Sequence, residues 1–188
     1  MSESKFPMIM QSTAAVTSIL TVLLCLVFAY TRADWVLVAV ISAGTTAYHF
    51  VMRLVVGFVI PRMTGYRFDY RKSWFQPKKW ESSLYRKLKV KQWKGHLPTY
   101  APGQFSLKTN STLQVIQNMC GAEVVHEVIM VLSFLPLLLV PVFGEFPVFF
   151  ITSLLSALFD SIFVIAQRYN RPRPVRIYEK QNRGDLCP

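Results

Sequence analysis

We expect an all-α integral membrane protein, a four-helix bundle with a basic, amphipathic cytoplasmic loop. Two observations predict this fold class. Hydrophobic residues make up 52% of the 188 residues, and four apolar segments approach the length that crosses a bilayer. The chain also carries 21 Lys and Arg against 10 Asp and Glu, a net charge of +11, and most of these cations lie outside the apolar segments. This pattern excludes a soluble enzyme that only carries a signal peptide.

The four apolar segments are long enough to be membrane helices, since about 20 residues cross the hydrocarbon core. Thr31 to Asp34 leaves room only for a tight hairpin, and Pro141, Gly144 and Pro147 mark the turn between the last two helices. No small-residue cleavage site fits before Asp34, so we expect the first helix to be retained. We treat residues 1–188 as one membrane domain, with helices at about 12–30, 35–60, 120–142 and 146–167, a cytoplasmic loop at 61–119 and a basic tail at 168–188.

The loop and the tail hold most of the cations and few acids. The positive-inside rule therefore places both of them, and both chain termini, in the cytoplasm. In the loop, Trp80, Leu84 and Leu88 recur at helical spacing among basic residues, which is typical of an amphipathic helix in the headgroup plane. The alternative is a solvated basic face that only fixes the topology. Aromatic and basic residues also mix in RNA-binding proteins, but no such motif is present, so we expect no nucleic-acid partner.

Glu123, His126 and Glu127 form the strongest candidate catalytic group, because their i, i+3, i+4 spacing places them on one helix face. Such groups are costly at the rim of a bilayer. The first interpretation is a histidine general base oriented by a carboxylate, as in acyl transfer. A metal site and a purely structural polar cluster are the alternatives. The order differs from the His-Glu-x-x-His of zinc peptidases, so we expect no metal.

The cysteines are far apart in the sequence, and we expect free thiols at Cys25, Cys120 and Cys187. Cys120 precedes the polar group directly and is an alternative acyl-accepting nucleophile. A structural thiol in apolar surroundings is the simpler interpretation.

The second helix carries His49 and Arg53 near its middle, where a charge needs a partner. Asp160 or Glu123 could supply the counter-charge. These residues either bind substrate or form a salt bridge that holds the helices together.

The fourth helix leaves the membrane through an arginine-rich segment whose guanidinium groups suit bidentate contact with phosphate or carboxylate. Anchoring in the headgroup region is the simpler alternative. Gln167 and Asn170 favour binding, because anchoring does not need their amides. The residues of this segment assigned to substrate binding are Gln167, Arg168, Asn170, Arg171 and Arg173.

Four blocks occur in order: Gln-Trp-Lys-Gly-His-Leu-Pro at 92–98, Phe-Ser at 105–106, Cys-Gly-Ala-Glu-Val-Val-His-Glu at 120–127 and Gln-Arg-Tyr-Asn-Arg-Pro-Arg at 167–173. From about Tyr48 to Arg173 the chain thereby resembles the glycosyl-4,4'-diaponeurosporenoate acyltransferase family. The resemblance implies a small multi-pass protein of the bacterial cell membrane that esterifies a fatty acyl chain onto the glucose of a glycosylated carotenoid, the last step of staphyloxanthin synthesis. It implies the reaction type more directly than the acceptor.

We therefore expect an acyltransferase that acts on a hydroxyl of a glycosylated lipid or carotenoid, in carotenoid biosynthesis. His126 would be the base, with Glu123 and Glu127 as its carboxylates. We expect no cofactor; an acyl donor such as acyl-CoA or acyl carrier protein is a co-substrate. The further residues assigned to substrate binding are His49, Arg53, Lys94, Lys108 and Asp160.

Two other function classes are kept as alternatives. A non-enzymatic membrane protein that binds lipid or scaffolds a partner explains the charge and the aromatic residues, but not the acid and imidazole group. A metal-dependent intramembrane hydrolase would require bound zinc. A transporter is disfavoured, because four helices without a visible inverted repeat leave little room for a midplane site.

Overall fold

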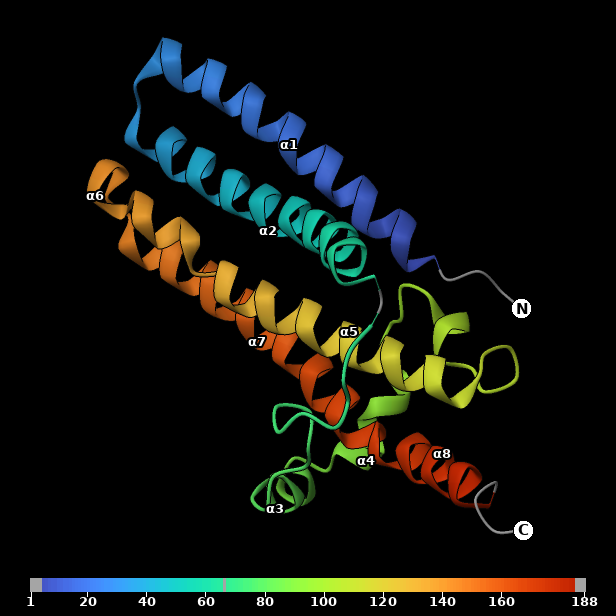
Figure 1. Ribbon diagram of the computed structural model, residues 1–188. Helices are drawn as coiled ribbons and strands as arrows, with labels where there is room; N and C mark the ends of the chain where they lie inside the picture. The colour runs from blue at the N-terminus through green and yellow to red at the C-terminus, as the bar shows by residue number, and fades with distance from the viewer. Residues whose placement is uncertain (1–4, 66, 185–188) are drawn as a thin grey trace. The chain divides into compact units, whose positions relative to one another are not determined.

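The structure is a computed structural model of the chain and describes residues 5–65 and 67–184. Every regular element in these residues is a helix, so the all-α prediction is confirmed (Figure 1). The elements are α1 (Phe6–Thr31), α2 (Asp34–Thr64), α3 (Glu81–Lys87), α4 (Val90–Trp93), η1 (Lys94–His96), η2 (Pro102–Phe105), α5 (Thr112–Leu132), η3 (Leu135–Leu139), α6 (Val140–Phe143), α7 (Phe146–Asn170) and α8 (Pro172–Gly184).

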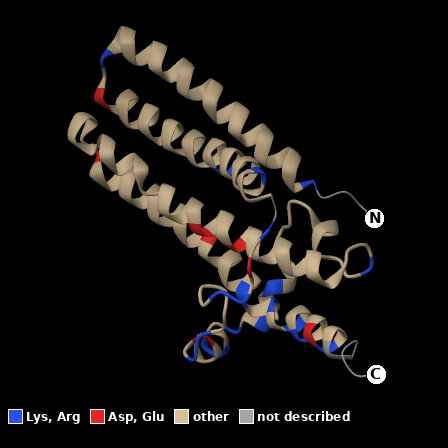
Figure 2. Cartoon of the chain, viewed as in Figure 1, with Lys and Arg blue, Asp and Glu red and all other residues tan. Residues whose placement is uncertain are grey.

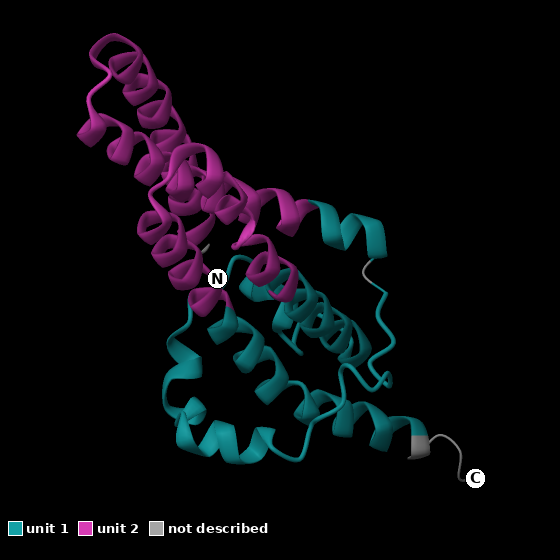
Figure 3. Cartoon of the chain, turned by 90° about the vertical axis from the view of Figure 1, so that its left-hand side faces the viewer, with its two compact units in different colours: residues 1–4, 59–126, 161–188 teal, residues 5–58, 127–160 magenta. Residues whose placement is uncertain are grey.

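The chain divides into two compact units (Figure 3). Among the described residues, unit 1 contains Val59–His126 and the chain from Ser161 onward. Unit 2 contains Lys5–Phe58 and Glu127–Asp160. Helices α2, α5 and α7 each contribute residues to both units.

Unit 2 begins with the helical hairpin of α1 and α2. The predicted tight turn is confirmed: Arg32 adopts a left-handed backbone conformation (φ 53°), and its N–H caps α1 on the carbonyl of Phe28 at 2.9 Å. Helix α2 then starts at Asp34. Helix α1 begins at Phe6, earlier than expected near residue 12, because Pro7 lies in its first turn, where a missing N–H costs nothing.

Four helical stretches are long and apolar enough to cross a membrane, as predicted: Phe6–Thr31, Asp34–Thr64, Thr112–Phe143 and Phe146–Asn182. Large apolar side chains on α1 are exposed, for example Val16 at 63% and Leu26 at 64%. The hydroxyl of Thr17 donates to the carbonyl of Thr13 in its own helix at 2.7 Å, so it needs no outside partner. A helix is suited to a lipid environment when its exposed side chains are apolar and its hydroxyl groups form hydrogen bonds within the helix itself.

Helix α5 begins at Thr112, well before the expected start at Cys120. Ser111 caps it, since its hydroxyl accepts the N–H of Gln114 at 3.2 Å. The prediction from hydropathy missed this first part because Gln114, Gln117 and Asn118 interrupt its apolar residues. Regular α-helix ends at Leu132, and η3 and α6 continue the apolar run as far as Gly144, whose φ of 70° makes the turn into α7.

The basic tail after residue 167 is helical rather than irregular, which the sequence interpretation did not anticipate. Helix α7 ends at Asn170 and α8 starts at Pro172, since proline is tolerated in a first helical turn. On one side of α8, Val175 and Tyr178 pack against a buried cluster of unit 1 that comprises Tyr70, Phe75, Ile116 and Cys120. Burial of these apolar groups gives the tail a fixed position within unit 1.

The predicted amphipathic helix of the loop is present but short. Helix α3 ends before Lys89, whose φ of 50° separates it from α4. Trp80 and Leu88 of the expected apolar face are exposed, at 63% and 42%, whereas Glu81 is buried at 3%. In unit 1, Lys and Arg gather over α3, α4 and α8 (Figure 2).

Candidate active site

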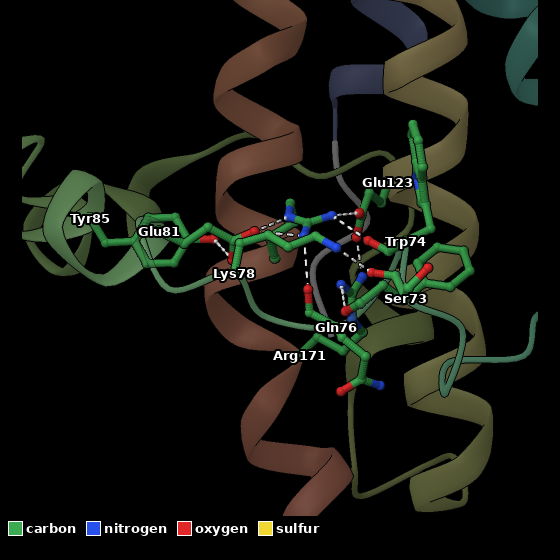
Figure 4. A network of polar contacts seen from close by, with 10 residues as sticks. Ser73, Trp74, Gln76, Lys78, Glu81, Tyr85, Glu123 and Arg171 are labelled. Atoms are coloured by element: carbon green, nitrogen blue, oxygen red, sulfur yellow. Dashed lines mark hydrogen bonds and ion pairs between the residues drawn. The ribbon is translucent and has the colours of Figure 1, made fainter.

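Glu123 is the centre of a buried polar network in unit 1 (Figure 4). Its side chain is 0% exposed and lies on α5. Arg168 Nη1 donates to its Oε1 at 2.5 Å, and Arg171 Nη1 donates to its Oε2. The two arginines are three residues apart across the α7–α8 junction, so both guanidinium groups reach the same carboxylate.

Arg168 connects Glu123 to a second buried carboxylate, Glu81 of α3. Its Nε and Nη2 donate to Oε1 of Glu81 at 3.0 and 2.6 Å. It also donates to the main-chain carbonyls of Trp74 at 3.0 Å and Gln76 at 3.2 Å. A planar guanidinium with five N–H groups can make such a set of contacts, and an ammonium group cannot.

Arg171 is 4% exposed and contacts the same turn of the loop. Its Nη2 donates to the carbonyl of Phe75 at 2.5 Å, and its guanidinium lies over the Phe75 ring, 5.2 Å from the centroid. The carbonyls of Trp74, Phe75 and Gln76 therefore all accept from an arginine. The network thus fixes the path of the loop in unit 1.

The network is electrically balanced, because Glu81 and Glu123 offset Arg168 and Arg171. Buried charges are stable only when paired and hydrogen-bonded, a condition that these four residues meet. Tyr85 adds a bond from its hydroxyl to Oε2 of Glu81 at 2.8 Å. Burial raises the pKa of Tyr85, and the bond to Glu81 raises that pKa further.

His126 follows Glu123 by three residues on α5 and is half-buried. Its imidazole stacks on the ring of Phe163 from α7, with centroids 4.7 Å apart and planes inclined by 10°. Each oxygen of Glu123 accepts a bond from an arginine, so this carboxylate anchors the network. Glu127 directly follows His126 on α5 and is also half-buried, but it is grouped with unit 2.

Lys94 and Asn170, both predicted from the sequence, are brought together in unit 1: the ammonium of Lys94 donates to Oδ1 of Asn170. The ammonium also lies over the ring of Tyr169, 4.6 Å from its centroid. Burial lowers the pKa of Lys94, and the like charges of Arg173 and Lys91 lower that pKa further.

Two other predicted residues do not join these contacts. Lys108 is exposed in a turn, and Gln167 is half-buried on α7. Within the described ranges, neither side chain forms a hydrogen bond or an ion pair. Their assignment to substrate binding stays a prediction.

Unit 2 contains a second polar group of its own, and here the expected counter-charge is confirmed. Arg53 of α2 pairs with Asp160 of α7, with Nη2 2.5 Å from Oδ2. Arg53 also donates to the hydroxyl of Ser156 at 2.8 Å and to the carbonyl of His49 at 3.0 Å. The Ser156 hydroxyl is 2.8 Å from that of Ser133, so the pair belongs to a hydrogen-bonded chain.

Two buried polar side chains of unit 2 have no hydrogen-bond partner among the described residues: His49, at both ring nitrogens, and Ser153, at its hydroxyl. His49 lies one turn before Arg53 on α2, and Ser153 lies about one turn before Ser156 on α7. Arg53 donates a hydrogen bond to Ser156. On each helix, the side chain without a partner therefore lies about one turn before the residue that makes this bond. Buried polar groups without partners are rare and call for an explanation.

Glu81, Tyr85 and the loop carbonyls are members of the network that the sequence interpretation missed. One signal was available for Glu81, because it is one of only two acids in the strongly basic segment 61–119. Its spacing of four residues from Tyr85 was another. Nothing in the sequence indicated which carbonyls would turn toward the arginines.

Within residues 5–65 and 67–184, no group of three or more His, Cys, Asp or Glu side chains is arranged to hold a metal ion. Cys120 is buried and Cys25 is exposed, both as free thiols. Cys187 lies outside the described residues.

A family model, glycosyl-4,4'-diaponeurosporenoate acyltransferase, matches residues 71–180, more than half of the chain. The chain belongs to this family. It is accordingly an acyltransferase of carotenoid modification, and membership implies a lipid acceptor and an acyl donor. The matched segment encloses the whole buried network of unit 1 together with His126. No curated protein and no solved structure shows a significant match to the chain.

Proposed function

We propose that this acyltransferase esterifies a fatty acyl chain onto a hydroxyl of a glycosylated lipid or carotenoid, within the cell membrane. The observation that carries the proposal is that the family match encloses one rigid, charge-balanced network with a histidine one helical turn from its central carboxylate. Side chains that ion pairs already hold in position need little rearrangement during a reaction, and such preorganisation favours catalysis.

His126 is the general base in this proposal. It accepts the proton of the acceptor hydroxyl as the oxygen attacks the acyl carbonyl carbon. When the bond from that carbon to the donor breaks, the imidazolium returns the proton to the leaving group. The acyl group thus passes to the acceptor, and the histidine ends as it began. Glu127, which is grouped with unit 2, keeps only the role of a second carboxylate that the sequence pattern predicts for it.

Glu123 acts as a positioning residue in this scheme. Its two ion pairs fix α5 against the α7–α8 junction of unit 1, and the stack on Phe163 fixes the plane of the imidazole. Stacking uses the face of the ring, so the two nitrogens on its edge are directed away from Phe163. Orientation of this kind lowers the entropic part of a reaction barrier.

Other predicted residues are proposed to bind the two substrates. The orphaned imidazole of His49, with Arg53 and Asp160 beside it on α2 and α7, suits a hydroxyl-bearing acceptor. Lys94, Asn170 and Arg173 suit the anionic part of an acyl donor such as acyl-CoA or acyl carrier protein. No cofactor is required, since the donor already supplies an activated acyl group.

Location in the cell membrane, as a multi-pass protein with both termini cytoplasmic, completes the proposal. Four long apolar helices support it. The basic segments that follow the second and fourth of them support the orientation, because cations accumulate on the cytoplasmic side.

The test is an acyl-transfer assay with purified protein in lipid nanodiscs, a glycosylated carotenoid as acceptor, and acyl-CoA or acyl carrier protein as donor. Mass spectrometry of the ester identifies the product. We expect His126→Gln to lower the rate by about 10²- to 10⁴-fold, which is typical for loss of a general base. His96→Gln is the matched control, because His96 is exposed in η1 and has no role in the proposal. Full activity of a folded His126→Gln protein would refute the assignment.

A further inference from the structure

The cations near the end of α7 fall into two classes. Arg168 and Arg171 are neutralised by Glu81 and Glu123. Farther along, three exposed cations pair with no carboxylate in the part of the chain that the structure describes: Arg173, Arg176 and Lys180. The sequence alone had treated Arg168, Arg171 and Arg173 as equivalent. The structure assigns anion binding to the second class.

The three unpaired cations border a single surface pocket of unit 1. Its volume is about 380 Å³, and Tyr169, Pro172 and Ile177 complete its lining. Positions 173, 176 and 180 are spaced three and four residues apart on α8, so they share one helix face. The acid of this stretch, Glu179, does not line the pocket.

Lys94 does not line the pocket, but it adds a positive charge beside one of the lining residues. Its ammonium lies over the ring of Tyr169, a lining residue, at 4.6 Å from the centroid. Arg173, another lining residue, repels this ammonium strongly enough to lower its pKa, after the larger effect of burial. An anion in the pocket would relieve this repulsion.

We propose that this pocket binds a phosphate group. Two arginines with planar guanidinium forks, a lysine and a tyrosine ring form a cationic, partly apolar recess, which is suited to a phosphate carried on an organic group. The proposal rests on the proposed function in one respect: the phosphate is that of the acyl donor, as in coenzyme A. The same chemistry occurs in an anionic phospholipid headgroup, and the two sources are separated below.

The first experiment measures binding without turnover. Full-length protein in nanodiscs of phosphatidylcholine is titrated calorimetrically with coenzyme A and, in parallel, with pantetheine, which lacks phosphate. We expect Arg173→Gln/Arg176→Gln to weaken coenzyme A binding by about tenfold or more, because charge-assisted bonds are lost, and to leave pantetheine unaffected. Lys72→Gln/Lys79→Gln is the matched control, since both lysines are exposed in unit 1 and do not line the pocket.

The second experiment addresses the lipid source. The same variants are purified from membranes that contain phosphatidylglycerol, and native mass spectrometry measures the phospholipid that stays bound. Loss of bound phosphatidylglycerol in the pocket variant, with coenzyme A binding unchanged, supports the phosphate pocket with a headgroup as its occupant. If neither ligand is affected, or if pantetheine binding falls as much as coenzyme A binding, the proposal is overturned.

His126→Gln separates this inference from the proposed function. It should lower the acyl-transfer rate by about 10²- to 10⁴-fold and retain coenzyme A binding. The wild-type protein could prove inactive with every acceptor while Arg173→Gln/Arg176→Gln still weakens coenzyme A binding. That result would support the phosphate pocket and refute the proposed reaction.

Discussion

Arg171 and Glu123 form an ion pair from which solvent is almost completely excluded: the arginine is 4% exposed and the glutamate 0%. The pair joins the start of α8 to the middle of α5 within unit 1. Because Arg168 reaches the same carboxylate and continues to Glu81, three segments far apart in the sequence are held by four charges. Removing any one charge leaves a buried partner uncompensated.

Glu123→Gln should be strongly destabilising. It leaves two arginines with the single charge of Glu81, and uncompensated buried charges cost about 3–5 kcal/mol. Thermal unfolding in a neutral detergent measures the loss. Glu179→Gln is the control, because Glu179 is exposed on α8. Equal unfolding midpoints for the two variants would contradict the ion-paired network.

Arg168→Lys should fail to restore the wild-type stability, although it conserves the charge. Lysine has three donors on one nitrogen, and Arg168 bonds to Glu81, Glu123 and two carbonyls from a planar fork. We expect a loss of about 1–3 kcal/mol from unsatisfied buried acceptors, read from the same unfolding measurement. Arg86→Lys is the matched control, because Arg86 is exposed on α3.

Asp160→Asn should destabilise unit 2, because it removes the counter-charge of Arg53. The expected cost is about 3–5 kcal/mol, and the double variant Arg53→Met/Asp160→Leu should recover most of it, since a buried ion pair can be replaced by apolar groups. Glu145→Gln, at an exposed position of the same unit, should be neutral. A double variant less stable than Asp160→Asn would argue against a simple pair.

Tyr85→Phe should lower stability by about 1–3 kcal/mol at neutral pH, because the hydrogen bond to Glu81 is lost. The folded protein raises the pKa of Tyr85 above its usual value near 10. Its contribution is therefore fully present below about pH 10, the pKa in the unfolded chain, and declines as the pH rises toward the folded pKa. Unfolding followed from neutral to alkaline pH should show the two proteins converging. A constant difference above pH 10 would show that the pKa is not raised.

His49→Leu should raise the unfolding temperature and lower the acyl-transfer rate. Both ring nitrogens of His49 are buried and have no hydrogen-bond partner in the described part of the chain, which is a cost that leucine removes. The same orphaned groups are the proposed contact for the acceptor, so activity should fall while stability rises, as is common at binding sites. A variant with unchanged activity would reduce His49 to a structural residue.

Three features followed from the sequence: the four apolar helices, the hairpin at Thr31–Asp34 and the need of Arg53 for a counter-charge. Each depends on a local property, namely hydropathy, turn residues or the cost of a buried charge. The resemblance also indicated the family, since short motifs keep their order along the chain. Helix boundaries were less predictable. The start of α5 at Thr112 and the helix α8 were missed, because a serine cap and two prolines in a first turn extend or begin a helix where hydropathy shows no apolar run.

By itself the sequence determined which charged and polar groups the protein has and which helix faces carry them. Only the tertiary structure decided how those charges cancel. Glu81 and Arg168 are 87 positions apart, and no local pattern predicts that they pair. Glu123 and Arg171 form the other pair, and among residues 5–65 and 67–184 no carboxylate pairs with Arg173, Arg176 or Lys180, which line a pocket. The physical reason is that the energy of a charge depends on its burial and on its nearest partners, and both are set by contacts between segments distant in the chain.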